Sequence, residues 1–195
     1  MSKRDHRQSG FTLIELLIVI AIIGILAGLA MTGISTVRQS ANEALTKQTI
    51  SGLANALESY KQDEGEFPGI GDDIDEETNQ FPILFNALFG ERKPNGPGGR
   101  SAPYLPLKED MVVVYDEDLD EYRMAKRGEI YDDNVEKFLA DAWGNPMIYR
   151  CNKGQKYEPY MHQRHGADIY SVGEDEIDQT KEGDHDNDND DIGNW

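Results

Sequence analysis

One apolar run near the N-terminus limits the folds that are open to this chain. From Leu16 to Val37 there are 22 consecutive residues without a charge. A helix of that length spans about 33 Å, which matches the hydrocarbon thickness of a bilayer. Three bases lie among the first seven residues, and Arg38 follows the run. The pattern predicts a single membrane-spanning helix whose N-terminus stays in the cytoplasm.

A carboxylate stands at the start of this run. Glu15 lies between the apolar run and the hydrophobic residues just before it. A carboxylate in hydrocarbon is costly unless it gains a partner, although the helix macrodipole favours an acid in the first turn. Two interpretations are open: a signal anchor that tolerates one acid near its end, or a carboxylate kept for a partner that comes later.

The N-terminal residues also carry a family resemblance. The segment GFTLIE at 10–15, followed by IIGILA at 22–27, resembles the class III signal sequence of type IV pilins and pseudopilins. The resemblance implies that prepilin peptidase removes residues 1–10 as a leader, by cleavage between Gly10 and Phe11. It further implies methylation of the new Phe11 terminus. Glu15 is then expected to pair with the terminal amine of a neighbouring subunit during assembly.

Simple chemistry agrees with that pairing. Cleavage leaves an ammonium at Phe11, a group that ordinarily titrates with a pKa of about 7.7–8.0, and N-methylation keeps it a cation. An ion pair between Phe11 of one copy and Glu15 of the next neutralises both charges. Gly24 and Gly28 form a GxxxG pattern, which allows close helix approach. Glycines are also common in membrane helices without such a role.

The helical period continues beyond the membrane run. Apolar residues recur at spacings of mostly three and four from Ile34 to Tyr60, and Gly65 and Pro68 then end the pattern. The sequence predicts one helix over 11–62, transmembrane to about residue 37 and amphipathic after it. An amphipathic half needs a domain to pack on. Residues 63–195 are therefore expected to form a globular head.

The head is expected to combine a short helix with several strands. A helix around 83–88 stops at Gly90, and a Gly/Pro-rich loop covers 94–103. Strands are predicted at 111–115, at 122–125 after a turn at 116–120, and after a tight turn at 141–146. A last strand is predicted at 168–173. The fold class is α+β: a long N-terminal helix packed on a small antiparallel sheet.

Composition excludes several classes of function. The chain has 19 Lys and Arg against 37 Asp and Glu, a net charge of −18, so nucleic acid is not an expected partner. Cys151 is the single cysteine, so no intramolecular disulfide is available. Because no nucleophile triad or phosphate-binding loop stands out, no enzymatic function is expected.

A second block of residues resembles one branch of the pilin-like proteins. DAWGNPMIYR at 141–150, DIYSVG at 168–173 and DDIGNW at 190–195 are similar to segments of the major pseudopilin of type II secretion, with Ala142 in place of a proline. The resemblance implies a structural subunit of the inner membrane with its head in the periplasm. Its implied partners are its own copies, joined through the N-terminal helix, other pseudopilins and the inner-membrane assembly platform.

Two other functions are weighed against this one. A type IV pilin subunit shares the signal sequence, but the missing second cysteine and the closing DDIGNW argue against it. A membrane-anchored calcium-binding or enzymatic domain that never polymerises is the other alternative. Glu15 and the junction between Gly10 and Phe11 argue against that domain.

An acidic loop over 174–191 is a candidate calcium site. Ten acids and one base, Lys181, lie in this loop, and clustered carboxylates suit calcium, which takes six to eight oxygen ligands. The bland alternative is a solvated acidic tail. The stretch from Asp184 begins like an EF-hand loop but has Asn189 at its sixth position and Trp195 at its twelfth, so an EF-hand is rejected.

The family resemblance implies a particular ligand set for calcium. It comprises the carboxylates of Asp175, Asp190 and Asp191, backbone oxygen from Val172, and Glu174. Because the loop is longer than usual, acids within it are possible substitutes, namely Asp184, Asp186 and Asp188. His162 and His165 with Asp168 have a weak metal-site spacing, and a pair of surface histidines is the favoured interpretation.

Overall fold

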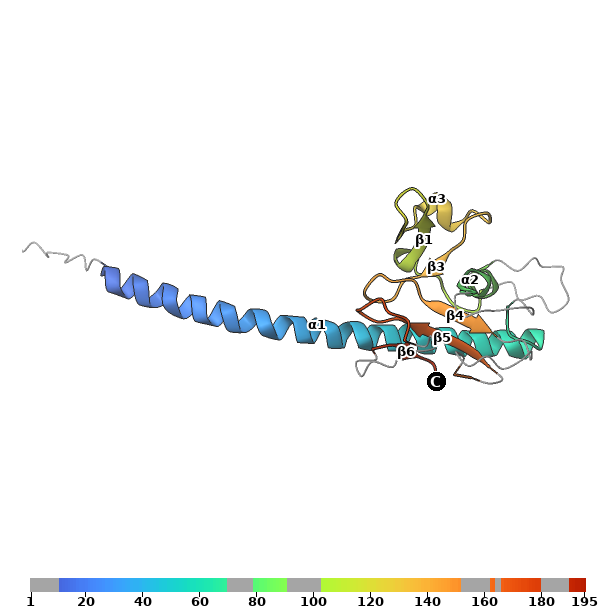
Figure 1. Cartoon of the computed structure of the whole chain (residues 1–195), viewed down its shortest axis with the longest axis horizontal. Helices are drawn as coiled ribbons and strands as arrows, with labels where there is room; N and C mark the ends of the chain where they lie inside the picture. Colours follow the sequence, from blue (N-terminus) through green and yellow to red (C-terminus); the bar gives the residue numbers. More distant parts are fainter. Residues whose placement is uncertain (1–10, 70–78, 91–102, 152–161, 164–165, 180–189) are drawn as a thin grey trace, which may run out of the picture. The chain divides into compact units, whose positions relative to one another are not determined.

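The computed structural model describes residues 11–69, 79–90, 103–151, 162–163, 166–179 and 190–195, without the side chains of 29–35. The chain divides into two units, and the boundary between Ala41 and Asn42 falls within the first helix. Figure 1 shows the elements along the chain.

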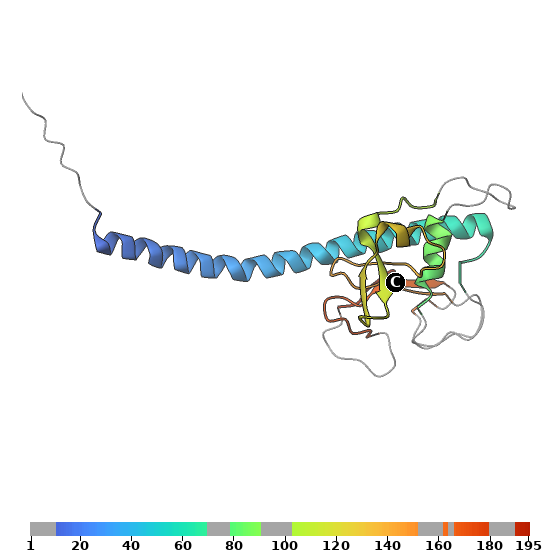
Figure 2. The ribbon, with the colours of Figure 1, turned by 90° about the horizontal axis from the view of Figure 1, so that it is seen from above.

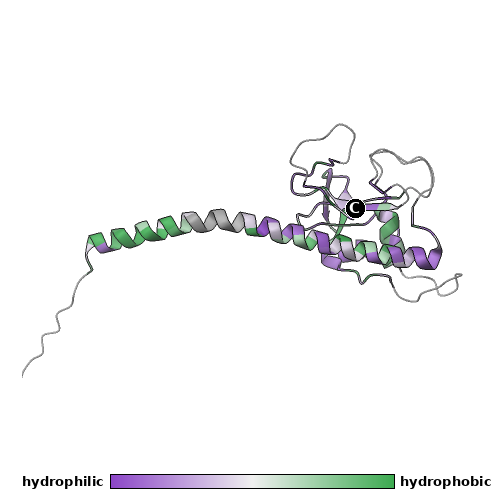
Figure 3. Cartoon of the chain, turned by 90° about the horizontal axis from the view of Figure 1, so that it is seen from below, coloured by the Kyte–Doolittle hydropathy of each residue, from purple (hydrophilic) through white to green (hydrophobic). Residues whose placement is uncertain are grey.

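Helix α1 (Leu13–Glu64) is the longest element, with 52 residues. It ends where Gly65 takes a left-handed φ of 87°, a conformation that glycine adopts without steric cost. Figure 3 shows apolar colouring along the first turns of α1 and a mixed pattern along its second half. The prediction of a helix over 11–62 is confirmed within two residues at each end.

The predicted membrane span covers the first part of α1, up to about residue 37. In the part of the chain that the structure describes, no helix combines the length and the apolar character needed to cross a membrane. The span up to about residue 37 therefore stays a prediction.

The second unit is built around one hydrophobic core. From α1, Ile50, Leu53 and Leu57 are buried at spacings of three and four. Helix α2 (Phe81–Phe89) adds Phe81, Leu84 and Leu88, and ends at Gly90 as predicted. Strand residues such as Tyr149 and Ile169, both fully buried, complete this core. The amphipathic half of α1 thus packs on the head, as expected from the sequence.

The described residues of the head also form two small antiparallel sheets, where one sheet was expected. The first has the order β2-β1-β3, from β1 (Val112–Asp116), β2 (Glu121–Met124) and β3 (Phe138–Leu139). The second has the order β4-β5-β6, from β4 (Ile148–Cys151), β5 (Ala167–Ser171) and β6 (Ile192–Gly193). An isolated bridge between Ala140 and Pro146 lies between β3 and β4 in the sequence. In Figure 1, β4 and β5 run beside the second half of α1, whereas β1 lies farther from it.

The strand predictions hold with one correction. The hairpin of β1 and β2 and the strand after the tight turn are confirmed. The strand predicted as the last is β5, and the two-residue β6 follows it, pairing Ile192 with Ser171. A single turn of helix, α3 (Arg127–Ile130), and a 3-10 turn, η1 (Glu109–Met111), were not predicted. Figure 2 shows the same elements from above.

Candidate functional site

Two residues of the N-terminal motif, Thr12 and Glu15, form hydrogen bonds with each other at the start of α1. The backbone N–H and the hydroxyl of Thr12 both donate to Glu15 Oε2, at 2.9 and 2.8 Å. The Thr12 hydroxyl accepts the N–H of Glu15 at 3.3 Å. This reciprocal pattern is a capping box, which satisfies helix donors that otherwise lack a partner. Glu15 therefore has a partner within its own chain, and Phe11, directly before the cap, is 79% exposed.

Asp141 organises the turn that precedes β4. Its Oδ1 accepts the N–H groups of Trp143, Gly144 and Asn145, all at 2.9 Å. Its Oδ2 accepts the hydroxyl of Ser171 at 2.5 Å. Burial raises the pKa of Asp141, although the four hydrogen bonds oppose that shift. One carboxylate thus joins the turn to the end of β5, and Trp143 packs against the core as expected.

The same turn reaches α1 and the start of the acidic loop. The N–H of Ala142 donates to the Thr46 hydroxyl at 3.2 Å, and Asn145 Nδ2 donates to the Gly173 carbonyl at 2.9 Å. Gly173 has a φ of 73°, and a Cβ added there would lie 2.3 Å from a carboxylate oxygen of Asp190. Only glycine fits this position, because the conformation is left-handed and the space is taken.

Three of the predicted calcium ligands, Asp175, Asp190 and Asp191, bind groups of the turn that follows this glycine. Asp190 Oδ2 accepts the N–H of Glu174 at 2.7 Å, and Asp191 Oδ2 accepts the N–H of Gln179 at 3.1 Å. Asp175 accepts the N–H of Ile177 at 2.9 Å and the side-chain amide of Gln179 at 3.0 Å. The acids at both ends of the loop are therefore brought to one turn.

The other two predicted ligands also lie at this turn. Val172 directly follows β5 and is buried, so its contribution would come from its backbone. Glu174 exposes its side chain and uses its backbone N–H to bind Asp190. The three mid-loop acids at 184, 186 and 188 lie outside the described residues.

Burial and neighbouring acids oppose the charged form of one carboxylate at this turn, that of Asp191. The pKa of Asp191 is raised to about 7, first by burial and then by Asp178, Asp190 and Asp175. The Oδ1 atom of Asp190 and the Oε1 atom of Gln179 are buried acceptors without a hydrogen-bond donor in the described part of the chain. Such oxygens and crowded carboxylates are ligands that a hard cation prefers.

The donor set therefore fits calcium in chemistry, although it is incomplete. Within the described ranges, no three His, Cys, Asp or Glu side chains are grouped so that they could hold a metal ion. A calcium ion at this turn would draw on amide and backbone oxygens as well as carboxylates. The ligand set stays a prediction.

A buried ion pair ties the acidic turn to the core. Arg150 on β4 is 2% exposed, and its Nη2 lies 3.1 Å from Asp178 Oδ2. The Tyr170 hydroxyl donates to the same oxygen at 2.9 Å. Removing one member of such a pair would leave the other charge buried without a counter-ion, which is strongly destabilising. The bonds from Arg150 and Tyr170 hold the Asp178 carboxylate at this position.

His162, the described member of the histidine pair, packs against the C-terminal residue. The ring of His162 stacks on the Trp195 ring, with centroids 3.7 Å apart. The Asp168 carboxylate accepts the N–H groups of His162 and Gln163, at 2.7 and 3.1 Å. Both carboxylate oxygens of Asp168 therefore accept backbone hydrogen bonds. His165 lies outside the described residues.

Several of these contacts were missed at the level of sequence. The spacing of Thr12 and Glu15 is that of a capping box, so that contact was open to prediction. Asp141 has a local signal as the first residue of the predicted tight turn, but its bond to Ser171 joins segments distant in the chain. Gln179 carries no such signal, because it acts through an uncharged amide. Their roles appear only once the fold brings β4, β5 and the terminus together.

Comparisons with known proteins identify a family motif and several relatives of this chain. A family model described as the prokaryotic N-terminal methylation motif matches residues 5–31. The type II secretion system core protein G of Pseudomonas aeruginosa is 30% identical over 192 residues, or 97% of this chain and 96% of the relative. The protein of that name from Klebsiella michiganensis is 27% identical over 192 residues, 98% of this chain and 96% of the relative. The one from Vibrio cholerae is 31% identical over 108 residues, 53% of this chain and 74% of the relative. No solved structure matches the chain.

A long helix that begins within a methylation motif and a small α+β head together define the class of prepilin-like proteins. Similarity along nearly the whole length of the P. aeruginosa protein narrows this class. The chain belongs to the family of type II secretion system core protein G, the major pseudopilin.

Proposed function

We propose that this protein is a structural subunit of the type II secretion pseudopilus. Prepilin peptidase removes the leader before Phe11, and one span anchors the subunit in the inner membrane with its head in the periplasm. Copies then polymerise through the N-terminal helix, together with other pseudopilins and the inner-membrane assembly platform. Its work is mechanical rather than catalytic.

Near-full-length similarity to a core protein G carries this proposal, since it covers 97% of the chain and not the signal segment alone. A type IV pilin or a non-polymerising anchor would share only the N-terminal motif. The capping box supports the same proposal, because it presents Glu15 at the first turn beside the expected new terminus.

Complementation tests the proposal. A strain that lacks its major pseudopilin gene, in the organism that carries this protein, is expected to lose secretion and to regain it with the wild-type chain. Overproduction should give filaments that can be sheared from the cells. Restored secretion without filaments or subunit cross-links would refute polymerisation as the mode of action.

Glu15 is assigned a role in assembly. The variant Glu15→Val removes a charge that is costly in hydrocarbon, so it should insert in the membrane at least as well as wild type. It should nevertheless form few filaments, because the neighbouring Phe11 ammonium loses its counter-ion. Thr12→Val, which removes only the side-chain part of the cap, is the matched control for helix capping. Normal filament yield in Glu15→Val would rule out the pairing.

Calcium is proposed as the staple of the acidic turn. Asp175, Asp190 and Asp191 would supply carboxylates, with backbone oxygen from Val172 and a contribution from Glu174. The bound cation would neutralise charges that otherwise repel one another and raise the pKa of Asp191. With no disulfide available, calcium binding would stabilise the head by about 2.7 kcal/mol at a hundredfold excess over its dissociation constant.

The melting temperature of the head, residues 36–195, tests this assignment, because this fragment contains the hydrophobic core that the described residues form. Calcium should raise the melting temperature relative to a chelator. The shift should be lost in Asp175→Ala and Asp191→Ala and kept in Asp186→Ala. An equal melting temperature with calcium and with chelator would refute the calcium site and favour the alternative interpretation, a solvated acidic tail.

A further inference from the structure

The hairpin of β1 and β2 ends in an exposed apolar residue. Leu119 is 60% exposed and lies in the turn that joins the two strands. A single exposed leucine is common on protein surfaces. This one differs because its surroundings are charged and its backbone is fixed. The flanking acids, all exposed, are Glu117, Asp118, Asp120 and Glu121.

Hydrogen bonds hold the tip of this hairpin in one conformation. The Asp116 carbonyl accepts the N–H of Leu119 at 3.2 Å and the N–H of Asp120 at 2.9 Å. The Asp116 carboxylate accepts the N–H of Asp118 at 3.1 Å, and the Tyr115 hydroxyl donates to Asp120. The side chain of Leu119 is therefore presented on an ordered turn, which lowers the entropy lost when it is buried.

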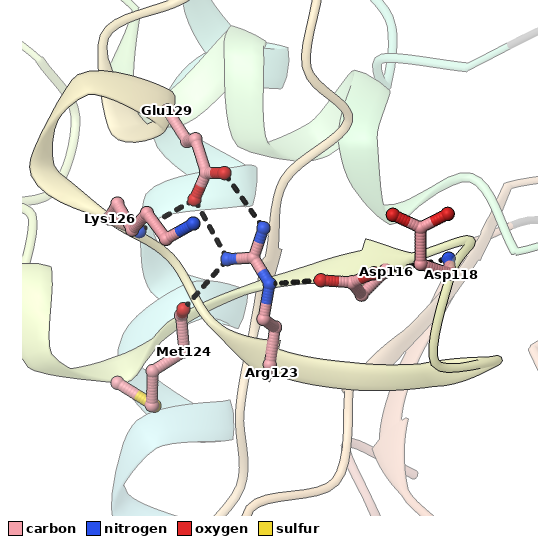
Figure 4. A network of polar contacts seen from close by, with 6 residues as sticks. All are labelled: Asp116, Asp118, Arg123, Met124, Lys126 and Glu129. Atoms are coloured by element: carbon pink, nitrogen blue, oxygen red, sulfur yellow. Dashed lines mark hydrogen bonds and ion pairs between the residues drawn. The ribbon is translucent and has the colours of Figure 1, made fainter.

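A polar network anchors this tip to α3, as Figure 4 shows. Arg123 Nε donates to Asp116 Oδ2 at 2.5 Å. The other two nitrogens of the Arg123 guanidinium donate to Glu129, at 2.9 and 2.8 Å. Glu129 also accepts the N–H of Lys126 at 2.7 Å. The network thus links the turn that carries Leu119 to a second element of the head.

A small apolar cavity lies beside α1 in the same unit. Its volume is about 190 Å³, and its lining includes Gly52 from α1, Phe89 from α2 and the buried Leu139. A Cβ added at Gly52 would meet no atom within 4 Å, so the helix leaves open space there. Since one water takes roughly 30 Å³ of liquid, this volume is enough for the four carbons of a leucine side chain.

The cavity and the hairpin tip lie at opposite ends of one strand. Met111 lines the cavity and directly precedes β1, whereas the tip follows Asp116 at the other end of β1. Met111 and Glu117, at the two ends of this five-residue strand, are six residue steps apart, which corresponds to roughly 20 Å. An ordered tip cannot reach the cavity of its own chain, so only another molecule can bring the two together.

The one charged residue among those that line the cavity has a sign that suits the same pairing. The exposed Lys108 lines the cavity, and the acids around Leu119 are of opposite sign. A contact between two different surfaces of identical chains does not close on itself and propagates into a helical filament. We propose that the hairpin tip of one copy docks on the next, with Leu119 in the cavity beside Gly52. This inference rests on the proposed polymerisation and names one of its lateral contacts.

Cross-linking of the full chain in cells tests the docking directly. Glu117→Cys at the tip and Gln48→Cys at the cavity are both exposed positions, whereas the native Cys151 is buried. With a short bismaleimide, the double variant should give a ladder of dimers, trimers and larger species. Each single variant should give no ladder. Sheared filaments, counted in the same cells, report polymerisation independently.

The outcomes separate the docking from the proposed function. A ladder together with filaments supports the docking. Filaments without a ladder overturn the docking and leave the pseudopilus subunit intact. A parent protein that forms no filaments overturns polymerisation and, with it, this contact.

Two substitutions test the two sides of the proposed contact, Leu119 at the hairpin tip and Gly52 at the cavity. Leu119→Asp should cut filament yield by about tenfold or more, since burying one leucine is worth at least a tenfold change in affinity. Met124→Asp, which is 50% exposed on β2 of the same hairpin, is the control and should keep the yield within about twofold. Gly52→Phe should fill the cavity, and its control is Ser51→Phe on an exposed face of α1. Equal yields for each variant and its control, with unchanged melting temperatures, would refute the contact.

Discussion

The carboxylate of Asp141 is expected to be a main determinant of the stability of the head. The residue is 5% exposed and accepts four hydrogen bonds, three from backbone N–H groups and one from Ser171. Hydrogen bonds to a charged group contribute about 1.5–3 kcal/mol each, but some of the released donors reach water and the cost of burying a charge is recovered. Asp141→Ala should therefore lower the free energy of unfolding by about 3 kcal/mol. For a domain of this size, the melting temperature should fall by about 6–12 °C.

Asp141→Asn separates the two parts of this effect. The amide keeps an oxygen for the three backbone donors and loses only the acceptor for the Ser171 hydroxyl, so the loss should be about 1 kcal/mol. Urea titration of residues 36–195, followed by tryptophan fluorescence, measures both variants. Asp133→Ala, at an exposed acid, controls for the change in net charge. A loss below about 1 kcal/mol in Asp141→Ala, or equal losses in the alanine and asparagine variants, would refute the role of the carboxylate as a hub.

Two further predictions concern the acidic turn and the hairpin network. Gly173→Ala should destabilise the head and weaken the rise in melting temperature that calcium causes, because the new Cβ meets Asp190. Gly144→Ala is the control, since this glycine has a φ of 102° but open space around it. It should destabilise the head and leave the effect of calcium in place. Arg123 holds the pKa of Glu129 at about 2, well below its usual value of 4.5. A lowered acid pKa stabilises the fold above pH 4.5, and this contribution is lost as the pH falls toward 2. Glu129→Gln should therefore flatten the dependence of the melting temperature on pH between 5 and 2, and an unchanged slope would contradict the network.

Much of the fold was accessible from sequence because its signals are local. The helical period and the glycine and proline after Gln62 set the extent of α1. The run of valines and the turn after Tyr115 predicted the hairpin of β1 and β2. Such segments carry their own pattern of burial, so a single chain is enough to recognise them.

The shorter elements were missed because tertiary contacts alone define them. Strand β3 has two residues, and it exists because Leu139 and Phe138 pair with Val112 and Val113. Strand β6 is equally short and depends on its pairing with β5. No periodicity is visible over two residues, so neither strand has a signal of its own.

The candidate calcium site was also predictable only in part from the sequence. The acids of the loop are visible as a charge run, but their meeting depends on backbone donors at Glu174 and Gln179. Those donors are positioned by the turn that Asp141 holds at Ser171. Sequence reasoning therefore locates the acids, and the fold decides which oxygens approach one another.

Mass spectrometry of the mature N-terminus tests the central claim most directly. Filaments sheared from cells with an active prepilin peptidase are digested, and the N-terminal peptide is identified. The expected peptide begins at N-methylated Phe11, since cleavage after Gly10 frees the terminus that pairs with Glu15. A filament protein that retains Met1 and its leader would contradict the assignment as a processed, polymerising pseudopilin.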